Sequence, residues 1–200
     1  MMRKFILYLL LCSFAFAIGV MSGPYGRVVL GIIISSFGMT TITKTIYVDI
    51  AFDDNEYQAI VAAGAEWSYA TKKLVKFNFV RGINQNTYNS IRNDPDKIAM
   101  FKINDGDNST ARIDEYFKDK KVGCYMRHDN TQLIYIIISR IYDYGLMEKV
   151  IAHEYGHALG IGHVNKDKDL MNEFIDEDVR ITKDDIKELC KLYLCNPNHY

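Results

Sequence analysis

The stretch His153-Glu154-Tyr155-Gly156-His157-Ala158-Leu159-Gly160-Ile161-Gly162-His163 holds three of the five histidines of this 200-residue chain. On an α-helix, residues four apart lie on the same face, so His153 and His157 can direct two imidazoles at one metal ion. Glu154 lies about 100° further round the helix, beside the ion and within reach of a water bound to it. Gly160 permits a left-handed turn that returns His163 as a third ligand. Three protein ligands leave a fourth position open, which is typical of a catalytic zinc site.

The spacing is more specific than a short HExxH pattern, which needs a helical context to be meaningful. HExxHxxGxxH fixes five positions, and the two additional ones are those that the geometry requires. The alternative, a helix with unrelated surface histidines, is therefore disfavoured. His128 and His199 match no pattern, and we expect them to be ordinary surface or tail residues.

The extended zinc motif and the later Asp169-Leu170-Met171-Asn172 resemble the signature of the metzincins, which is a zinc motif followed by a methionine turn. Met171 lies eight residues after His163, a separation similar to that in the matrixins. The resemblance implies that Met171 lies beneath the zinc as the floor of the site and is not a ligand. From the residue type alone, Met171 could equally be a core methionine, because methionine commonly fills irregular gaps.

Two further stretches resemble matrixin catalytic domains. Residues 63–71, followed by Leu74 and Phe77, are similar to the first helix and second strand, and residues 181–186 are similar to the start of the C-terminal helix. The resemblance covers roughly residues 45 to 194. It implies an α+β, metzincin-like zinc protease domain, with a mixed twisted sheet of about five strands, an active-site helix and a C-terminal helix.

The chain also departs from the family pattern. Val164 follows the third histidine, where matrixins usually carry serine, so the subfamily is open. No tyrosine lies two residues after Met171, which argues against the astacin branch. No segment similar to the PRCGxPD propeptide motif is present, so the usual cysteine latch is missing.

Alternation of apolar and polar residues predicts strands over 45–52, 75–80 and 97–103, and a hairpin of 122–127 with 132–139 around Asp129-Asn130. Helical periodicity predicts a helix capped by Asp54 that runs through Trp67, and a helix that bears the zinc motif and begins near Leu146. Residues 104–121 are expected to form a polar, charged loop.

The last predicted helix opens with Thr182 and Asp185, a pair similar to a capping box. Its expected core-facing residues are Ile186, Leu189, Leu192 and Tyr193. The order strand, helix, three or four strands, helix, turn and helix suits a small α+β protein.

The N-terminus predicts targeting out of the cytoplasm. Arg3 and Lys4 precede the uncharged apolar run 5–20, and Ala15-Phe16-Ala17 offers a small-x-small cleavage site. An uncleaved membrane anchor is the alternative, although the run is somewhat short for a bilayer. The sequence thus divides into residues 1–20 as signal peptide or anchor, 21–44 as a leader or linker, and 45–200 as the catalytic domain. Either alternative places that domain outside the cytoplasm, secreted or anchored.

Three cysteines remain after removal of such a signal: Cys124, Cys190 and Cys195. An oxidising compartment favours one disulfide and one free thiol. Cys190 and Cys195 are the nearest pair, although spacing leaves the connectivity open. For Cys124, a buried small hydrophobe is favoured over a thiolate that binds and silences the zinc.

Composition and loops bear on partners and other cofactors. The net charge of −1 gives no basic face, so nucleic acid is not an expected partner, and a monomer is expected. The loop 105–110 is rich in oxygen atoms, which suits Ca²⁺, but its spacing is not that of an EF-hand and a solvated turn is favoured.

The zinc motif predicts a metalloendopeptidase that acts on a protein or peptide substrate. One zinc ion would activate a water and polarise the scissile carbonyl, with Glu154 as general base. The resemblance implies that substrate adds as a strand along 122–127, so that Gly123, Cys124 and Tyr125 line the cleft. Specificity is expected from 172–179, where the acidic residues 176–178 either favour basic side chains or form a solvated turn.

Two other functions remain as alternatives. One is a catalytically silent, secreted zinc-binding relative, against which the intact Glu154 argues. The other is an anchored structural or interaction protein in which the motif is incidental.

Overall fold

A five-stranded mixed sheet organises the compact unit Thr41–Tyr200 of this chain. The computed structural model describes residues 41–83, 88–89, 91–92, 94–117, 121–128, 130–164 and 166–200. The predicted signal or anchor and nearly all of the predicted leader lie outside these residues. Within the part of the chain that is described, no helix has the length and apolar character that a membrane crossing requires.

The strands are β1 (Ile42–Asp49), β2 (Val75–Ile83), β3 (Lys97–Ile103), β4 (Gly123–His128) and β5 (Thr131–Ile137). Their order across the sheet is β2-β1-β3-β5-β4. β1, β2, β3 and β5 run parallel to one another, whereas β4 pairs antiparallel with β5 as the predicted hairpin. β4 is therefore an edge strand, and the mixed α+β sheet of five strands is confirmed.

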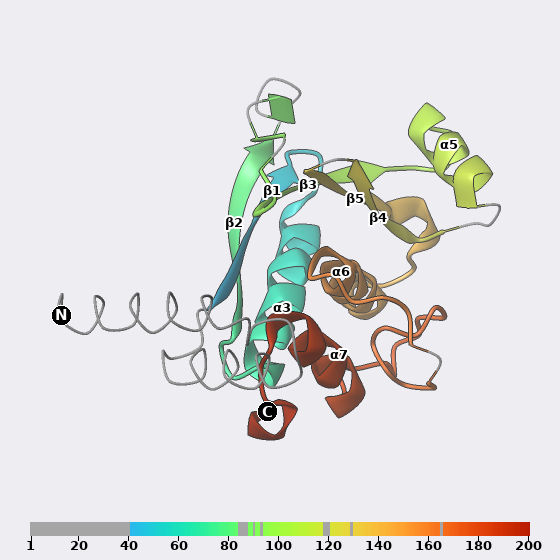
Figure 1. Ribbon diagram of the computed structural model, residues 1–200. Coiled ribbons are helices and arrows are strands. Elements are labelled where there is room, and N and C mark those ends of the chain that lie inside the picture. The colour runs from blue at the N-terminus through green and yellow to red at the C-terminus, as the bar shows by residue number, and fades with distance from the viewer. Residues whose placement is uncertain are drawn as a thin grey trace, which may run out of the picture. The chain divides into compact units, whose positions relative to one another are not determined.

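The helices are α3 (Asp54–Ala70), α5 (Asn108–Phe117), α6 (Tyr144–Ala158) and α7 (Lys183–Tyr193), with short 3₁₀ turns at Ile138–Arg140 and Pro197–His199. α3 packs against β2 and against α6, and α6 also packs against β4 and β5, so both helices cover the same face of the sheet (Figure 1). The main core lies between these two helices and the sheet. It includes Ile46 and Val48 of β1, Trp67 of α3, and Val150 of α6.

The first helix is capped one residue earlier than predicted. The Asp53 carboxylate accepts from the Glu56 N–H, and the Glu56 carboxylate accepts from the Asp53 N–H. This reciprocal pair requires an acidic residue three positions after the cap, which Asp53 has and Asp54 does not. The preceding strand ends at Asp49, before the predicted residue 52, because Phe52 is buried in the loop and not in the sheet.

Residues 104–121 were predicted as a loop, and that prediction is wrong for 108–117, which form α5. Its apolar residues Ile113, Tyr116 and Phe117 lie three and four positions apart, but only Thr110 and Ile113 of this helix are buried. Tertiary pairing also holds the helix, because the Arg140 guanidinium donates two hydrogen bonds to the Asp114 carboxylate, at 2.8 and 2.7 Å. Arg140 also pairs with Asp105. The preference for a solvated turn over a calcium site at 105–110 stays a prediction.

The C-terminal helix has the predicted capping box between Thr182 and Asp185. Its buried face is narrower than predicted. Leu192 and Tyr193 are 53% and 37% exposed, and Cys190 is buried beside Leu189. The difference arises because the helix ends at Tyr193, and its last turn extends past the core that Leu189 contacts.

Candidate active site

The zinc motif lies on α6 and the turn that follows it. Asp143 caps this helix by accepting from the Leu146 N–H. The helix ends in a Schellman motif, in which Ile161 N–H donates to Gly156 O and Gly160 N–H donates to His157 O. Gly160 has φ +93°, in the left-handed region that glycine favours. This turn carries the chain back toward the helix.

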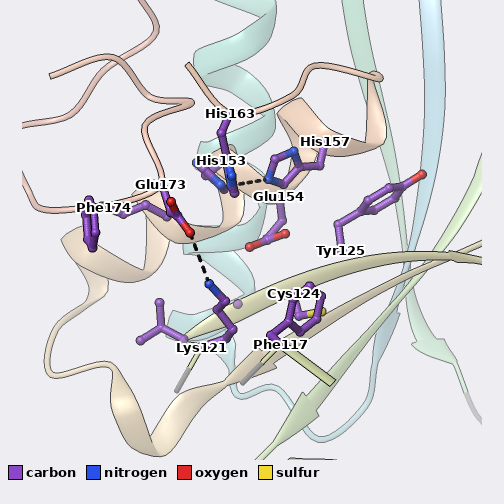
Figure 2. A pocket seen from close by; sticks show the side chains of 13 residues that line it. Phe117, Lys121, Cys124, Tyr125, His153, Glu154, His157, His163, Glu173 and Phe174 are labelled. Carbon is purple, nitrogen blue, oxygen red and sulfur yellow. Dashed lines mark hydrogen bonds and ion pairs between the residues drawn. The ribbon is translucent and has the colours of Figure 1, made fainter. Parts of the chain in front are cut away.

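The structure brings the three predicted histidines together. One ring nitrogen from each of His153, His157 and His163 lies within 4.8 Å of the other two (Figure 2). Nδ1 of His153 lies 2.7 Å from Leu170 O, and Nδ1 of His157 lies 2.8 Å from Ile161 O. Because a carbonyl only accepts, each Nδ1 carries the proton and each Nε2 has a free lone pair for a metal. The donor set therefore fits a tetrahedral zinc with one open position.

The environment of His153 and His157 favours the neutral form of both imidazoles, which metal binding requires. Burial lowers the pKa of His153 to about 3, with a smaller contribution from His157. Burial also lowers the pKa of His157.

Glu154 is 4% exposed and lies next to the triad. Burial raises its pKa to about 8, against the opposing effect of a hydrogen bond from the Tyr125 N–H. The second oxygen, Oε2, is buried and has no partner. A buried acceptor without a partner is uncommon in folded proteins and calls for an explanation. A Cβ at Gly123 would lie 2.8 Å from Glu154 Oε1, so the edge strand passes too close to the carboxylate for a side chain there.

In metal-free protein, the free energy of unfolding of the wild type is expected to fall relative to that of Glu154→Gln as the pH rises from about 5 to about 8. The carboxyl titrates ordinarily at 4.5 and in the fold at about 8. Between these pH values the folded chain binds more protons than the unfolded chain. The contribution of the Glu154 carboxyl to the free energy of unfolding is therefore complete below pH 4.5 and is lost as the pH rises through 8. The slope is at most about 1.4 kcal/mol per pH unit. Urea unfolding at several pH values measures it, and parallel curves for the two proteins would contradict the argument.

Met171 is fully buried and lies against the zinc-motif helix. A Cβ at Gly156 would overlap Met171 Sδ, so the glycine leaves room for the thioether against this helix. The Asp185 carboxylate accepts from the Leu170 and Met171 N–H groups, each at 3.2 Å. Because Leu170 O in turn orients His153, Asp185 supports the site through the methionine turn. Sequence patterns indicated Asp185 only as a helix cap.

The edge strand and the segment after Met171 form the two walls of a cavity of about 550 Å³ that contains the triad and Glu154. The predicted residues Gly123, Cys124 and Tyr125 line it. Val122 of the predicted substrate strand also lines it, and so do Glu173, Phe174 and Ile175, whereas Phe117 and Lys121 were not identified from the sequence. Phe117, Lys121 and Val122 precede the edge strand, and the other three lie in the predicted specificity segment.

The acidic residues 176–178 do not line this cavity and are exposed, which fits the solvated turn better than a pocket for basic side chains. Cys124 is 4% exposed and packs with Ile103, Ile113 and Ile137. Burial raises the pKa of its thiol to about 12, so the buried-hydrophobe interpretation is favoured over an inhibitory thiolate. His128 and His199 are exposed, as expected.

The family model described as matrixin matches residues 40–194, which include every element above except the last 3₁₀ turn. This chain belongs to the matrixin family of zinc metallopeptidases. This matrixin is similar in structure to metalloproteinase-II from Bacteroides fragilis, with 14% identity and a TM-score of 0.48 over 76% of this chain and 53% of that one. It is also similar to archaemetzincin from Methanopyrus kandleri, with 12% identity and a TM-score of 0.48 over 76% and 94% of the two chains. The matrixin thus spans about half the length of the first of these. A search of curated proteins finds no match.

Proposed function

We propose that this matrixin is an endopeptidase that hydrolyses peptide bonds in protein or peptide substrates, with Glu154 as general base. The observation that carries the proposal is the partnerless, buried Oε2 of Glu154 beside three converging imidazoles. A merely structural zinc site would have a fourth protein ligand and no need of such a carboxylate.

His153, His157 and His163 would hold the zinc, which fits the mutual distances of their ring nitrogens. When bound, zinc lowers the pKa of a water toward about 7, polarises the scissile carbonyl and favours the ionised form of a nearby carboxylate. Glu154 Oε2 accepts the proton of the attacking water, while the Tyr125 N–H holds the other oxygen in place. Glu154 then donates that proton to the leaving amine.

The substrate would add as a further strand along β4. The outer edge of β4 has no neighbouring strand in the sheet order, so its main-chain groups there can bind an extended peptide. Gly123, Cys124 and Tyr125 line the same cavity as Glu154 and the three histidines, which supports a bound backbone at this position.

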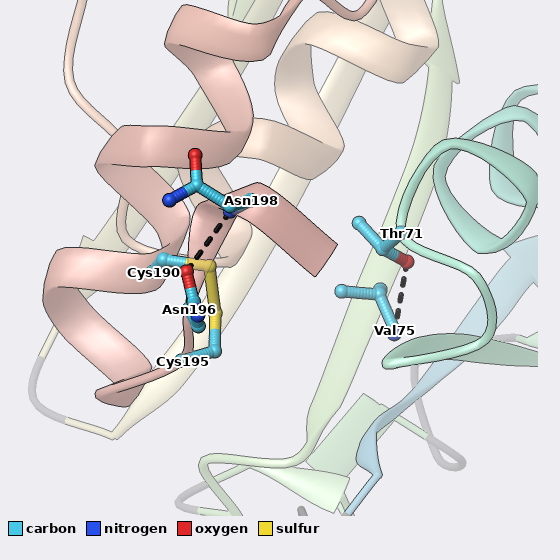
Figure 3. The surroundings of a disulfide bond; sticks show 6 residues. All are labelled: Thr71, Val75, Cys190, Cys195, Asn196 and Asn198. Carbon is cyan, nitrogen blue, oxygen red and sulfur yellow. Dashed lines mark hydrogen bonds between the residues drawn. A yellow bond between two sulfur atoms is a disulfide. The ribbon is translucent and has the colours of Figure 1, made fainter. Parts of the chain in front are cut away.

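We also propose that the domain acts outside the cytoplasm, either secreted or anchored through the N-terminal segment. A disulfide between Cys190 and Cys195 supports this, because such bonds persist in oxidising compartments (Figure 3). Cys124 is the one free cysteine among the described residues. A monomer stays the expectation.

Purified protein is expected to hold one zinc ion per chain and to cleave an unfolded protein substrate, with cleavage lost on chelation and restored by zinc. Metal analysis and a casein-type digestion assay measure the two quantities on the same sample. One zinc without any cleavage would instead favour the silent zinc-binding relative. A folded protein that takes up no zinc would refute the assignment of the histidines.

A further inference from the structure

An ion pair crosses the catalytic cavity from one wall to the other. Lys121 lies two residues before β4, and Glu173 lies two residues after Met171; Lys121 Nζ and Glu173 Oε1 are 3.8 Å apart (Figure 2). Both residues line the cavity that contains Glu154 and the three histidines. A substrate side chain that enters between these two residues separates the pair.

Separation of the ion pair destabilises the charge of Lys121 more than that of Glu173. The Lys121 side chain is 24% exposed, whereas that of Glu173 is 50% exposed. A half-exposed carboxylate that turns outward regains water, and exposed ion pairs contribute little to stability. A substrate that fills the cavity would remove water from Lys121, and a charge that loses both water and its partner is destabilised more strongly.

Lys121 is also held in place, while Glu173 lies in an exposed segment. The Lys121 carbonyl accepts a hydrogen bond of 2.6 Å from Arg140, the residue that binds α5. The Lys121 ammonium lies 5.8 Å from the centroid of the Phe117 ring. Phe174, next to Glu173, is 83% exposed. Lys121 therefore keeps its position when a substrate binds, whereas Glu173 can move away.

We infer that Lys121 is a specificity-determining residue that selects a substrate with an acidic side chain next to the scissile bond, with Glu173 as the internal carboxylate that this side chain displaces. The inference rests on the proposed function and names its substrate class. Among the described residues that line the cavity, Lys121 carries the one permanent positive charge. A neutral substrate side chain breaks the ion pair without replacing it, and a basic one leaves Lys121 next to a like charge.

The shape of the walls favours glutamate over aspartate. Phe117, Val122 and Ile175 are apolar and line the same cavity as Lys121. The methylene groups of a glutamate can lie against these surfaces while the carboxylate meets the ammonium, as amphipathic side chains commonly do.

The test uses a set of peptides in which each of four positions around the scissile bond carries Glu, Gln, Leu or Lys in turn. We expect the wild type to prefer Glu over Gln at one position only, by about fivefold in kcat/KM, the size of a partly desolvated ion pair. Lys121→Gln should abolish the preference, and Lys121→Glu should transfer it to Lys. Glu173→Gln should enlarge it, because the internal competitor is gone. Lys191→Gln is the matched control, since Lys191 pairs with Glu188 on the outside of α7 and leaves the preference unchanged.

A binding measurement separates this inference from the proposed catalysis. The dissociation constants of the same peptides for zinc-loaded Glu154→Gln protein should show the same preference for Glu, whether or not any variant hydrolyses them. If the Lys121 variants do not fold, the wild-type preference should still decline as salt is raised from roughly 0.05 to 0.5 M. Equal rates and equal affinities for the Glu and Gln peptides, or a preference that survives Lys121→Gln, would overturn the inference even if the protein is an active peptidase. Failure to bind or cleave any peptide would refute the proposed function and this inference with it.

Discussion

Glu154→Gln is expected to lower kcat by a factor of about 10² to 10⁴, the usual contribution of a general base, with zinc content unchanged at one per chain. The amide has the shape of the carboxyl and can still accept from the Tyr125 N–H, so the local structure should persist. It cannot accept the proton that Oε2, which has no other partner, would receive. Metal analysis and steady-state kinetics on the same preparation provide both numbers.

Glu148→Gln is the matched control for this variant. Glu148 lies on the same helix and is only partly buried, away from the cavity lining. Its substitution should leave kcat near the wild-type value. Full activity of the Glu154→Gln protein would contradict the general-base mechanism. Loss of zinc from this variant would instead indicate that Glu154 has a structural role in the metal site.

Local spacing explains how much of the site the sequence predicts. His153, Glu154 and His157 lie on one helical turn, and the Gly160 turn fixes where the chain goes next, so their juxtaposition follows from helix geometry alone. The edge position of β4 was implied by the family resemblance, and the sheet order agrees with it. These features depend on short stretches of chain.

The missed features depend on contacts between segments far apart in the sequence. α5 has a short apolar face of which only Ile113 is buried, and its docking also involves Arg140, which no local pattern connects to Asp114. The Lys121–Glu173 pair likewise joins two loops that meet only because β4 and the methionine turn flank the same helix. Each of these residues is an ordinary charged loop residue until the fold is known.

Asp185 combines a predicted local role with one that the sequence did not indicate. The capping box identifies it as the residue that accepts from Thr182 N–H at 2.8 Å. Its hydrogen bonds to Leu170 and Met171 fix the methionine turn against the start of α7. The same carboxylate thus connects the last helix to the floor of the metal site, and through Leu170 O to the ring of His153.

Asp185→Ala is therefore expected to lower the free energy of unfolding by about 2–4 kcal/mol, because buried N–H donors lose their acceptor. Met171 and Thr182 lose the hydrogen bonds from their N–H groups, whereas Leu170 N–H keeps Arg180 O. The looser turn should also weaken zinc binding by about 10- to 100-fold, the usual effect of replacing a residue that orients a metal ligand. Urea unfolding of the metal-free protein and competition with a zinc chelator measure the two effects separately.

The neighbouring Asp184 provides the control. It follows the same cap, but its carboxylate pairs with Lys166 at the surface and contacts neither the methionine turn nor the cavity. Asp184→Ala should therefore leave zinc affinity near that of the wild type. Asp185→Asn, which retains one acceptor oxygen, should lie between the wild type and Asp185→Ala in both measurements. If Asp185→Ala lowered stability but left zinc affinity intact, Asp185 would act as a helix cap alone, and His153 would be oriented by Leu170 O without help from α7.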